Sequence, residues 1–528
     1  MRTKELVFGT GGLRGIIGDG ADKMNVGTVE KASQGLTNYL NCKKKSADKI
    51  AVAYDSRINS ELFARSAAGV FAGNGIKTYI FRELMPTPCL SYAVRELNCS
   101  AGVVITASHN PSNYNGYKVY GADGCQITLS IAEAIQSEIG RIQSPEAIRR
   151  MKLDEGLKTG IIKFIEDSLL EKYLGCVSEN VKFEGDRTEK KLSIVYTPLN
   201  GSGLKLVTRI LLQNGFREVQ VVPEQREPDG NFSTCPYPNP EDDQALELGI
   251  QLAEKKGADI LLATDPDCDR LGVAVPDADG KFVRLTGNEL GMLLADYVFR
   301  RISESGRMPD TPVFMKTIVT STLQEQIAEH YGIRTINVLT GFKYIGEQIG
   351  LLEKEGKESS FVLGCEESCG YLRGTYVRDK DGVNAALLTC LMEEWYQQSG
   401  SSIYRRLMEL YQQYGFQKNG LHTYQFRGEA GMDKMRAIMN RIRRDLANRQ
   451  TRITGSLVEH FDDYENGLYG LPKSNVLRAV LDNGNSFIVR PSGTEPKLKV
   501  YTGAAGDSVE QAASEEEVLR KEIEQWIV

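Results

Sequence analysis

The sequence predicts an α/β protein: three successive related α/β domains with mixed sheets, followed by a C-terminal α+β domain. The length of 528 residues is too great for one compact core. A strand–helix–strand pattern occurs three times, and the last part of the chain follows a different pattern. The 41% hydrophobic and 25% charged residues are ordinary for a globular protein and exclude wholesale disorder.

The first strand–helix–strand unit begins with a predicted buried strand at Lys49–Asp55. A helix over Ser60–Asn74 and a strand at Ile76–Phe81 complete it. The same three parts recur twice, at Leu192–Thr197, Leu204–Gln213 and Glu218–Val222, and at Thr311–Thr317, Thr322–Tyr331 and Arg334–Val338.

A glycine followed by an apolar residue ends the helix of each unit, at Gly75, Gly215 and Gly332. Glycine suits the left-handed residue that ends many helices, and the apolar residue after it packs on the last turn. One such unit is generic, but three copies predict three α/β domains of related topology.

From about Phe416 the pattern is α+β and predicts a fourth domain. Its expected elements are strands at Leu421–Phe426, Val476–Leu481, Ser486–Arg490 and Lys497–Tyr501, a helix at Met432–Ala447 and a final helix. The predicted domains are 1–190, 191–305, 306–415 and 416–528.

Charge and composition restrict the possible partners. A net charge of −6 disfavours general binding to nucleic acid or to a membrane surface, but leaves an anionic small substrate open. No apolar run reaches the ~18 residues of a membrane-spanning helix. Ten cysteines without CxxC pairs indicate reduced thiols, so we expect a cytoplasmic protein without a zinc site.

The segment Asp265-Pro266-Asp267-Cys268-Asp269-Arg270 follows the predicted strand Ile260–Ala263. Ligands bind at this carboxyl edge of parallel sheets. Three carboxylates at i, i+2 and i+4 of an extended chain lie on one side and can converge on a hard cation. Oxygen-only ligands favour Mg²⁺, and the alternative is a solvated acidic turn.

A second segment, Thr106-Ala107-Ser108-His109-Asn110-Pro111, follows the apolar strand Val103–Ile105 and predicts an exposed serine at a similar edge. Taken alone it is better interpreted as a hydrogen-bonded turn. No GxSxG motif lies nearby, which makes a hydrolase triad improbable. Lys118 follows closely enough to lie near the same site.

Two further segments offer polar recognition groups. Arg490–Lys497 (RPSGTEPK) joins two predicted strands and could form an anion-binding nest or a plain hairpin turn. Glu366 and Ser368, after the short strand Ser360–Leu363, suit sugar hydroxyls, although the segment could equally begin a helix. The glycine-rich segment 8–15 lacks a preceding strand and a following helix, which disfavours a dinucleotide site.

Together these segments resemble the α-D-phosphohexomutase superfamily, which includes phosphoglucomutases and phosphomannomutases. The resemblance covers nearly the whole chain and rests on GTGGLRG at 9–15, TASHNP at 106–111, DPDCDR at 265–270, GCEESCGY at 364–371 and RPSGTEPK at 490–497. It implies a four-domain fold around a central cleft. The metal loop departs from the usual DGDGDR at Pro266 and Cys268, but keeps all three aspartates.

The resemblance also implies residue roles. Ser108 would carry the phosphoryl group, and Asp265, Asp267 and Asp269 would hold Mg²⁺ with it. Arg14 and Arg270 would stabilise transferred charge, and Lys118 or His109 would move a proton. The substrate contacts would be Thr340, Gly341, Glu366, Ser368, Lys380, Arg490, Ser492, Gly493, Thr494 and Lys497.

The activity implied is interconversion of glucose 1-phosphate and glucose 6-phosphate through a phosphoserine, with glucose 1,6-bisphosphate as activating intermediate. Glu366-Glu367-Ser368 resembles the glucose-preferring branch, and PSGTEPK fits the subgroup that includes phosphopentomutases and bisphosphate synthases. Mannose and pentose phosphates therefore stay open as substrates. A metal-dependent phosphatase and a non-catalytic sugar-phosphate binding protein are weaker alternatives. We expect small sugar phosphates as the partners, and a monomer or weak homodimer.

Overall fold

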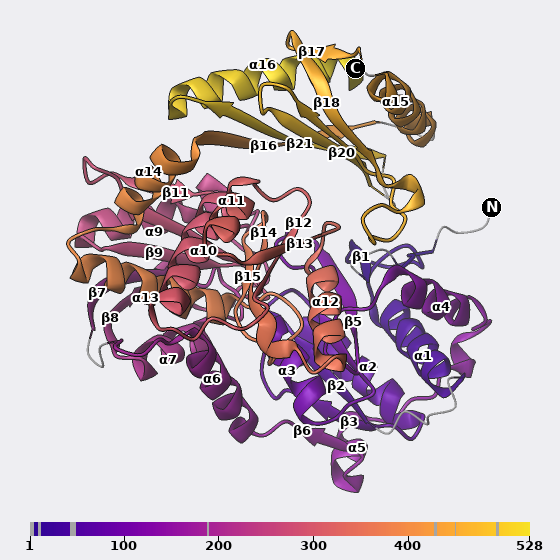
Figure 1. Ribbon diagram of the computed structural model, residues 1–528. Helices are drawn as coiled ribbons and strands as arrows, with labels where there is room; N and C mark the ends of the chain where they lie inside the picture. Colours follow the sequence, from indigo (N-terminus) through magenta and orange to yellow (C-terminus); the bar gives the residue numbers. More distant parts are fainter. Residues whose placement is uncertain are drawn as a thin grey trace.

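The computed structural model describes residues 5–8, 12–42, 49–186, 190–426, 430–448, 450–492 and 496–527. These residues form four sheets with flanking helices, and the fourth sheet with its helices stands at the top of the molecule in Figure 1. The predicted fold class is confirmed. No helix of the described residues is long and apolar enough to cross a bilayer.

The first sheet has six strands in the order β1-β5-β4-β2-β3-β6. β2 pairs in parallel with β3 and with β4, and β4 pairs antiparallel with β5. The strands are β1 (Leu13–Ile16), β2 (Lys49–Tyr54), β3 (Lys77–Ile80), β4 (Ala101–Ile105), β5 (Tyr114–Gly121) and β6 (Ile162–Phe164). The helices are α1 (Val26–Cys42), α2 (Ser60–Gly73), α3 (Thr87–Glu96), α4 (Leu129–Gly140), α5 (Leu153–Thr159) and α6 (Asp167–Val181).

The second sheet has the order β11-β10-β9-β7-β8 and repeats the same core. β7 pairs in parallel with β8 and β9, and β9 pairs antiparallel with β10. The strands are β7 (Lys190–Thr197), β8 (Phe216–Val221), β9 (Ile260–Thr264), β10 (Leu271–Pro276) and β11 (Phe282–Leu285). The helices are α7 (Leu204–Gln213), α8 (Pro223–Arg226), α9 (Asp243–Lys256) and α10 (Gly287–Glu304).

The third sheet, in the order β13-β12-β14-β15, consists of the same core without additional strands. β12 pairs in parallel with β13 and β14, and β14 pairs antiparallel with β15. The strands are β12 (Val313–Thr317), β13 (Arg334–Val338), β14 (Phe361–Glu366) and β15 (Gly370–Leu372). The helices are α11 (Leu323–His330), α12 (Phe342–Lys354), α13 (Gly382–Gln398) and α14 (Ile403–Tyr414).

The glycines that end the three repeated helices have the expected backbone. Gly75, Gly215 and Gly332 have φ angles of 82°, 89° and 69°, a region that side chains with a Cβ disfavour. The repeat is longer than the strand–helix–strand pattern in the sequence. Each unit adds a third parallel strand and then an antiparallel strand, so the three related cores are four strands wide.

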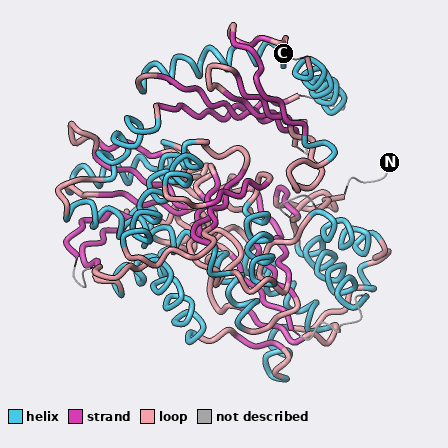
Figure 2. Tube along the Cα trace, in the orientation of Figure 1, coloured by secondary structure: helices cyan, strands magenta, loops and turns pink. Residues whose placement is uncertain are grey.

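The fourth sheet is antiparallel throughout, in the order β16-β21-β20-β19-β18-β17. Figure 2 shows its strands separated from the strands below by loops and helices. The strands are β16 (Phe416–Gln425), β17 (Arg452–Ile453), β18 (Ser456–Asp463), β19 (Leu477–Leu481), β20 (Ser486–Pro491) and β21 (Lys497–Gly506), with helices α15 (Ala430–Ala447) and α16 (Val509–Ile527). The sequence patterns missed β17 and β18 and began β16 too late, because these strands carry few apolar residues.

The buried core connects the first three sheets more closely than the fourth. One cluster runs from Leu90 of α3 through Leu293 of α10 to Leu387 of α13. The fourth sheet has its own core under α15 and α16. A small apolar cluster, including Leu339 and Ile488, is one apolar contact of the fourth sheet with the third. Phe416 of β16, stacked on Tyr411, is another contact, with the main core.

Candidate active site

Equivalent turns of the first three sheets carry the candidate functional side chains. The loop after β4 carries Ser108, the loop after β9 carries Asp265, and the turn after β14 follows Glu366. Each turn joins the third parallel strand of its core to the antiparallel strand. The carboxyl edges of three related sheets therefore face one site, as expected for ligand binding in α/β proteins.

Ser108 lies at the point where the first and second sheets meet. Its Oγ donates to Asp265 Oδ2 at 2.7 Å, and its side chain also lies beside His109, whose Nδ1 is 3.1 Å away. The residue has φ 51° and is only 4% exposed. The sequence predicted an exposed serine, which is wrong, because the loop after β9 with its three aspartates covers it.

An ion pair that sequence patterns missed supports the Ser108 loop. Arg57, buried after β2, donates to the backbone carbonyls of Ser108 and Asn110, and its Nε lies 3.4 Å from Asp55 Oδ2. Asp55 also accepts from Thr106 Oγ1 at 2.6 Å. The available signal was an aspartate and an arginine directly after a buried strand.

The loop with the three aspartates is a turn, so its predicted extended conformation is wrong. Cys268 has φ 51°, and its N–H donates to Asp265 O at 2.8 Å. This turn brings oxygens of Asp265, Asp267 and Asp269 within 4.8 Å of one another. All three carboxylates are buried. We call Asp265, Asp267 and Asp269, with Lys118 and Lys380, the acidic cluster.

Two lysines from other sheets neutralise part of this charge. Lys118 Nζ on β5 lies 2.7 Å from Asp267 Oδ2 and 3.5 Å from Asp269 Oδ2. Lys380 Nζ lies 2.9 Å from Asp269 Oδ2. Burial disfavours a charged ammonium, but the neighbouring carboxylates outweigh it and raise the pKa of both lysines.

The three carboxylates differ in their proton affinity. Burial and the charges of Asp267 and Asp269 raise the pKa of Asp265 well above its usual value. Burial also acts on Asp267, but the adjacent Lys118 outweighs it, and the pKa of Asp267 lies below its usual value. Burial and Asp267 raise the pKa of Asp269.

The carboxylate oxygens of the acidic cluster are suitable ligands for a divalent cation. Asp267 Oδ1 and Asp269 Oδ1 are buried and accept no hydrogen bond from the described residues. Buried carboxylate oxygens without a donor cost free energy, and a cation with oxygen ligands would supply the missing partner. The residues present therefore fit Mg²⁺ better than a metal that prefers sulfur or nitrogen.

The remaining charged residues of this region surround the serine. Arg270 Nη1 pairs with Glu241 Oε1 at 2.7 Å, and Arg14 Nη1 donates to Asn110 Oδ1 at 3.3 Å. Burial, followed by the charges of Arg270 and Arg14, lowers the pKa of His109 well below its usual value. The exposed Arg14 side chain thus reaches the Ser108 loop from β1.

The third sheet contributes polar groups without partners. Glu366 is 6% exposed; its Oε1 accepts from Ser368 Oγ at 2.5 Å, and its buried Oε2 has no hydrogen-bond partner among the described residues. Thr340 Oγ1 is likewise buried without one. Gly341, at φ 119°, precedes α12. These atoms remain available to ligand hydroxyls.

The fourth sheet contributes cations. Arg490 on β20 pairs in register with Lys499 on β21, and the N–H of Ser492 donates to Lys497 O at 2.7 Å. Burial, and then the charge of Arg490, lowers the pKa of Lys499. Lys343 of α12 has a pKa lowered first by burial, and Arg490 lowers it further. We call Arg490, Lys499 and Lys343 the basic group.

Sequence patterns found part of the basic group. They found Arg490 but missed Lys499 and Lys343, which lie outside any recognisable motif. Gly493 and Thr494, predicted as contacts, lie outside the described residues.

Four family models match this chain in order. They describe phosphoglucomutase/phosphomannomutase alpha/beta/alpha domain I at residues 5–146, domain II at 171–280 and domain III at 286–414. The fourth, the C-terminal domain of the same family, matches residues 440–521.

Curated relatives and solved structures agree with these matches. A phosphoglucomutase of Staphylococcus saprophyticus is 36% identical over 96% of this chain and 92% of its own. One from Staphylococcus aureus is 36% identical over 94% and 89%. Parafusin (phosphoglucomutase) from Paramecium superposes with a TM-score of 0.76 at 18% identity, over 99% of this chain and 96% of its own. A phosphoglucomutase/phosphomannomutase family protein from Burkholderia thailandensis gives 0.69 at 18%, over 99% and 96%.

Proposed function

The chain belongs to the phosphoglucomutase/phosphomannomutase family, and from that premise we propose that it interconverts glucose 1-phosphate and glucose 6-phosphate. The observation that carries the proposal is the hydroxyl of Ser108, 2.7 Å from Asp265 in a buried group of three carboxylates. Glu366-Glu367-Ser368 favours glucose as the sugar. A phosphomannomutase or phosphopentomutase of the same family is the second candidate, supported by the PSGTEPK loop.

Ser108 carries the phosphoryl group in this proposal. The bond between Ser108 Oγ and phosphorus breaks while a bond forms from phosphorus to the C6 oxygen of glucose 1-phosphate. The C6 hydroxyl proton passes to the neutral ring of His109, whose Nδ1 is 3.1 Å from Ser108 Oγ. Alternatively it passes to Lys118, after Lys118 has given its own proton to the neighbouring carboxylate of Asp267. The product of this step is glucose 1,6-bisphosphate.

In the second half of the reaction the sugar binds in the opposite orientation. The bisphosphate reorients so that its C1 phosphate faces Ser108, the serine takes that group back, and glucose 6-phosphate leaves. Glucose 1,6-bisphosphate therefore also serves as the activating cofactor, because it restores phosphoserine in an enzyme that has lost it.

Charge neutralisation is the main task of the surrounding residues, because phosphoryl transfer needs positioning more than a strong nucleophile. Mg²⁺, held by Asp265, Asp267 and Asp269 with the Ser108 phosphate, would neutralise charge on the transferring group. Lys118, Lys380, Arg270 and Arg14 bring positive charge to the same region.

The rest of the substrate is held by separate groups. Thr340, Gly341, Glu366, Ser368 and Lys380 are the proposed sugar contacts. The phosphate that does not react is assigned to Arg490, Ser492, Gly493, Thr494 and Lys497. Because Arg490 and Lys497 belong to strands of the fourth sheet, closure of this sheet over that phosphate would exclude water from the phosphoserine.

The test is coupled activity on glucose 1-phosphate, mannose 1-phosphate and ribose 1-phosphate side by side, with Mg²⁺ and a trace of the matching bisphosphate. We expect the largest kcat/KM with glucose 1-phosphate. Larger values for mannose or ribose would assign the second candidate. Release of inorganic phosphate in place of isomer would indicate a phosphatase, and binding without turnover a non-catalytic sugar-phosphate protein. Either result would refute the proposal.

A further inference from the structure

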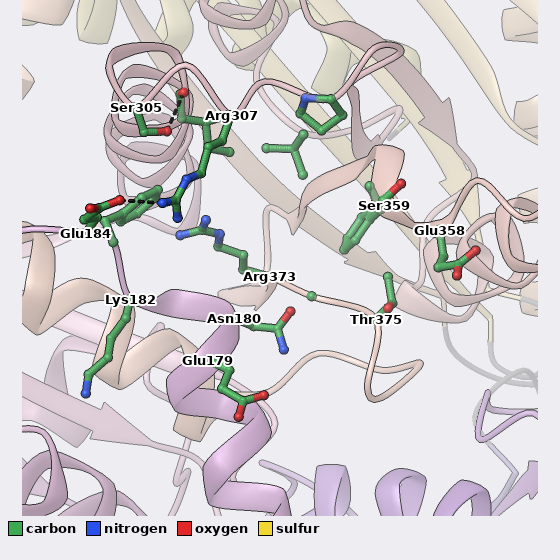
Figure 3. Close-up of a pocket in the computed structure, with 16 residues that line it drawn as sticks. Glu179, Asn180, Lys182, Glu184, Ser305, Arg307, Glu358, Ser359, Arg373 and Thr375 are labelled. Carbon is green, nitrogen blue, oxygen red and sulfur yellow. Dashed lines mark hydrogen bonds and ion pairs between the residues drawn. The ribbon is translucent and has the colours of Figure 1, made fainter.

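A cavity of about 520 Å³ lies beside the third sheet, away from the acidic cluster. Its walls come from the end of α6, the end of α10, the beginning of β14 and the loop after β15 (Figure 3). Phe361 begins β14 and lines the cavity, whereas Glu366 ends the same strand at the candidate active site. The cavity is thus at the opposite end of this strand, and its size suits a small-molecule site.

Arg373 lies in the wall of this cavity, and its positive charge is only partly compensated by neighbouring carboxylates. Its guanidinium carbon is 4.0 Å from the centre of the Phe183 ring, and its Nη1 donates to the backbone oxygen of Val181 at 3.3 Å. Among the described residues Arg373 forms no ion pair within 4 Å. The carboxylate that acts on it, Asp186, is paired with Arg301 at 3.0 Å.

The pKa of Arg373 is consistent with this arrangement. Burial, which outweighs the attraction of Asp186, lowers the pKa of Arg373 to about 10. A guanidinium almost always stays charged at neutral pH, so the cavity keeps a positive charge for which the neighbouring side chains provide no full counter-charge.

A second guanidinium reaches the same part of the cavity. Figure 3 shows Arg307 and Arg373 extending toward one another, with Glu184 beside them as the carboxylate paired with Arg307. Glu179 and Glu358 lie on other walls, away from the two guanidinium groups. The region near Arg307 and Arg373 therefore carries more positive than negative charge.

We propose that this cavity binds a small oxyanion, the phosphoryl or carboxylate group of a metabolite, between Arg373 and Arg307. A planar guanidinium presents paired N–H donors that match such an anion, and two of them would share it. Lys182, Asn180 and Thr375 line the remaining wall, but the Asn180 amide already donates to a backbone oxygen of α6, and Lys182 extends away from the two guanidinium groups in Figure 3.

The wall that holds Arg373 is fixed in place before any ligand binds. The N–H of Arg373 donates to Asn384 Oδ1 at 3.2 Å, and Asn384 Nδ2 donates to Arg373 O at 2.9 Å. The next residue, Gly374, has φ 95°, and a Cβ there would meet Asn180 at 2.2 Å. A site built on such a backbone loses little conformational freedom on binding.

Isothermal titration calorimetry on the full-length, metal-free chain tests the proposal, with inorganic phosphate and malonate as probes. All titrations use an Arg490→Met background, which weakens anion binding in the active-site cleft, so that the cavity site is recognised by its response to substitutions in the cavity wall. Ser359, an exposed residue that lines the cavity, takes the test substitution. Ser359→Glu adds a negative charge, and Ser359→Gln is the control of similar size without it.

We expect an anion site in the background protein whose affinity depends on the cavity residues. Ser359→Glu should weaken it about threefold, because it adds a like charge to another wall of the cavity, while Ser359→Gln should change it less than about 1.5-fold. Arg373→Met, checked by thermal unfolding to be folded, should abolish it. Preference for phosphate or malonate identifies the anion class. Binding of neither probe, or equal binding to the Glu, Gln and Met variants, would overturn the proposal.

Discussion

The acidic cluster and the basic group lie in one candidate site but manage their charge in opposite ways. In the acidic cluster, Lys118 and Lys380 pair with buried aspartates, and the ion pairs raise the pKa of both lysines. In the basic group, burial and the mutual repulsion of cations lower the pKa of Lys499 and Lys343. The charges of the first set are of opposite sign and pair with one another, whereas those of the second set are of one sign and repel one another.

The difference indicates separate tasks for the two sets. A balanced cluster with two orphaned carboxylate oxygens is suited to hold a cation and a reacting phosphoryl group in a fixed geometry. A group of mutually repelling cations on the fourth sheet and α12 is suited to capture a phosphate dianion. Changes in the acidic cluster should therefore affect kcat most, and changes in the basic group should affect KM most.

Ser108→Ala should cause the largest loss. Without the hydroxyl no phosphoserine forms, so kcat should fall by at least ~10³-fold while sugar-phosphate affinity, which depends on the basic group, changes little. Coupled assays and calorimetry measure the two quantities, and mass spectrometry of phosphopeptides should find phosphate on Ser108 in the wild type. Ser112→Ala, in the same loop, is the control. Phosphate located only on other residues would contradict the assignment.

Asp267→Asn should cause the second-largest loss of turnover. It removes one anionic ligand and breaks the ion pair with Lys118, so turnover at limiting Mg²⁺ should fall by about 10²-fold and should recover in part at high Mg²⁺. Asp279→Asn, in the exposed turn between β10 and β11, provides the control. Full activity of Asp267→Asn at limiting Mg²⁺ would show that these carboxylates do not hold the metal.

Much of the fold and part of the candidate site could be predicted from the sequence, because buried strands and short polar loops have strong local patterns. The α7 helix and the β13 strand lie at the predicted residues, and the three aspartates were recognised by their spacing. The turn at Cys268 and the burial of Ser108 could not be predicted, because both depend on contacts between sheets. The same applies to Lys343 and Lys499, whereas Arg57 was missed although it and Asp55 directly follow a buried strand. The boundaries at 190, 305 and 415 stay predictions.

Glu366→Ala should reduce activity on glucose 1-phosphate and on mannose 1-phosphate by a similar factor. In the proposed reaction the sugar binds in two orientations, and a residue useful in both would contact O3 and O4, whereas the two sugars differ only at C2. Loss of a charged hydrogen bond of about 1.5–3 kcal/mol predicts roughly a 10- to 150-fold fall in kcat/KM. A change in the ratio of the two sugars as large as the change in activity would show that Glu366 contacts C2.

Lys499→Met tests the basic group, where we expect the change to be in KM. The variant removes one of the cations around the phosphate that does not react, so KM should rise about tenfold while kcat changes less than twofold. Lys418→Met, on an exposed position of β16 in the same sheet, should leave both constants unchanged. A fall in kcat with unchanged KM would place Lys499 with the reacting groups and remove the distinction between the two sets.

Glu367 lies between the acidic cluster and the basic group. Its substitution should cause the smallest of the expected changes, and that change is in the free energy of unfolding. Its Oε2 accepts from Thr317 Oγ1 at 2.8 Å, and its carboxylate acts on Lys499. Burial and the adjacent Glu366 raise the pKa of Glu367 to about 7, from an ordinary value of 4.5. The folded protein thus binds a proton more tightly than the unfolded chain does between pH 4.5 and 7.

The free energy of unfolding should therefore lose this contribution as the pH rises from about 4.5 through 7. Glu367→Gln keeps an oxygen that can accept from Thr317 but cannot ionise, so it should match the wild type near pH 4.5 and be more stable above pH 7. The gain is at most about 3 kcal/mol, since one pKa unit corresponds to 1.36 kcal/mol. Urea unfolding at pH 4.5, 6 and 8 measures it, with Glu355→Gln as the exposed control. A difference that is the same at all three pH values would mean that Glu367 is ionised throughout, and that its charge is compensated by the basic group instead of opposed by burial.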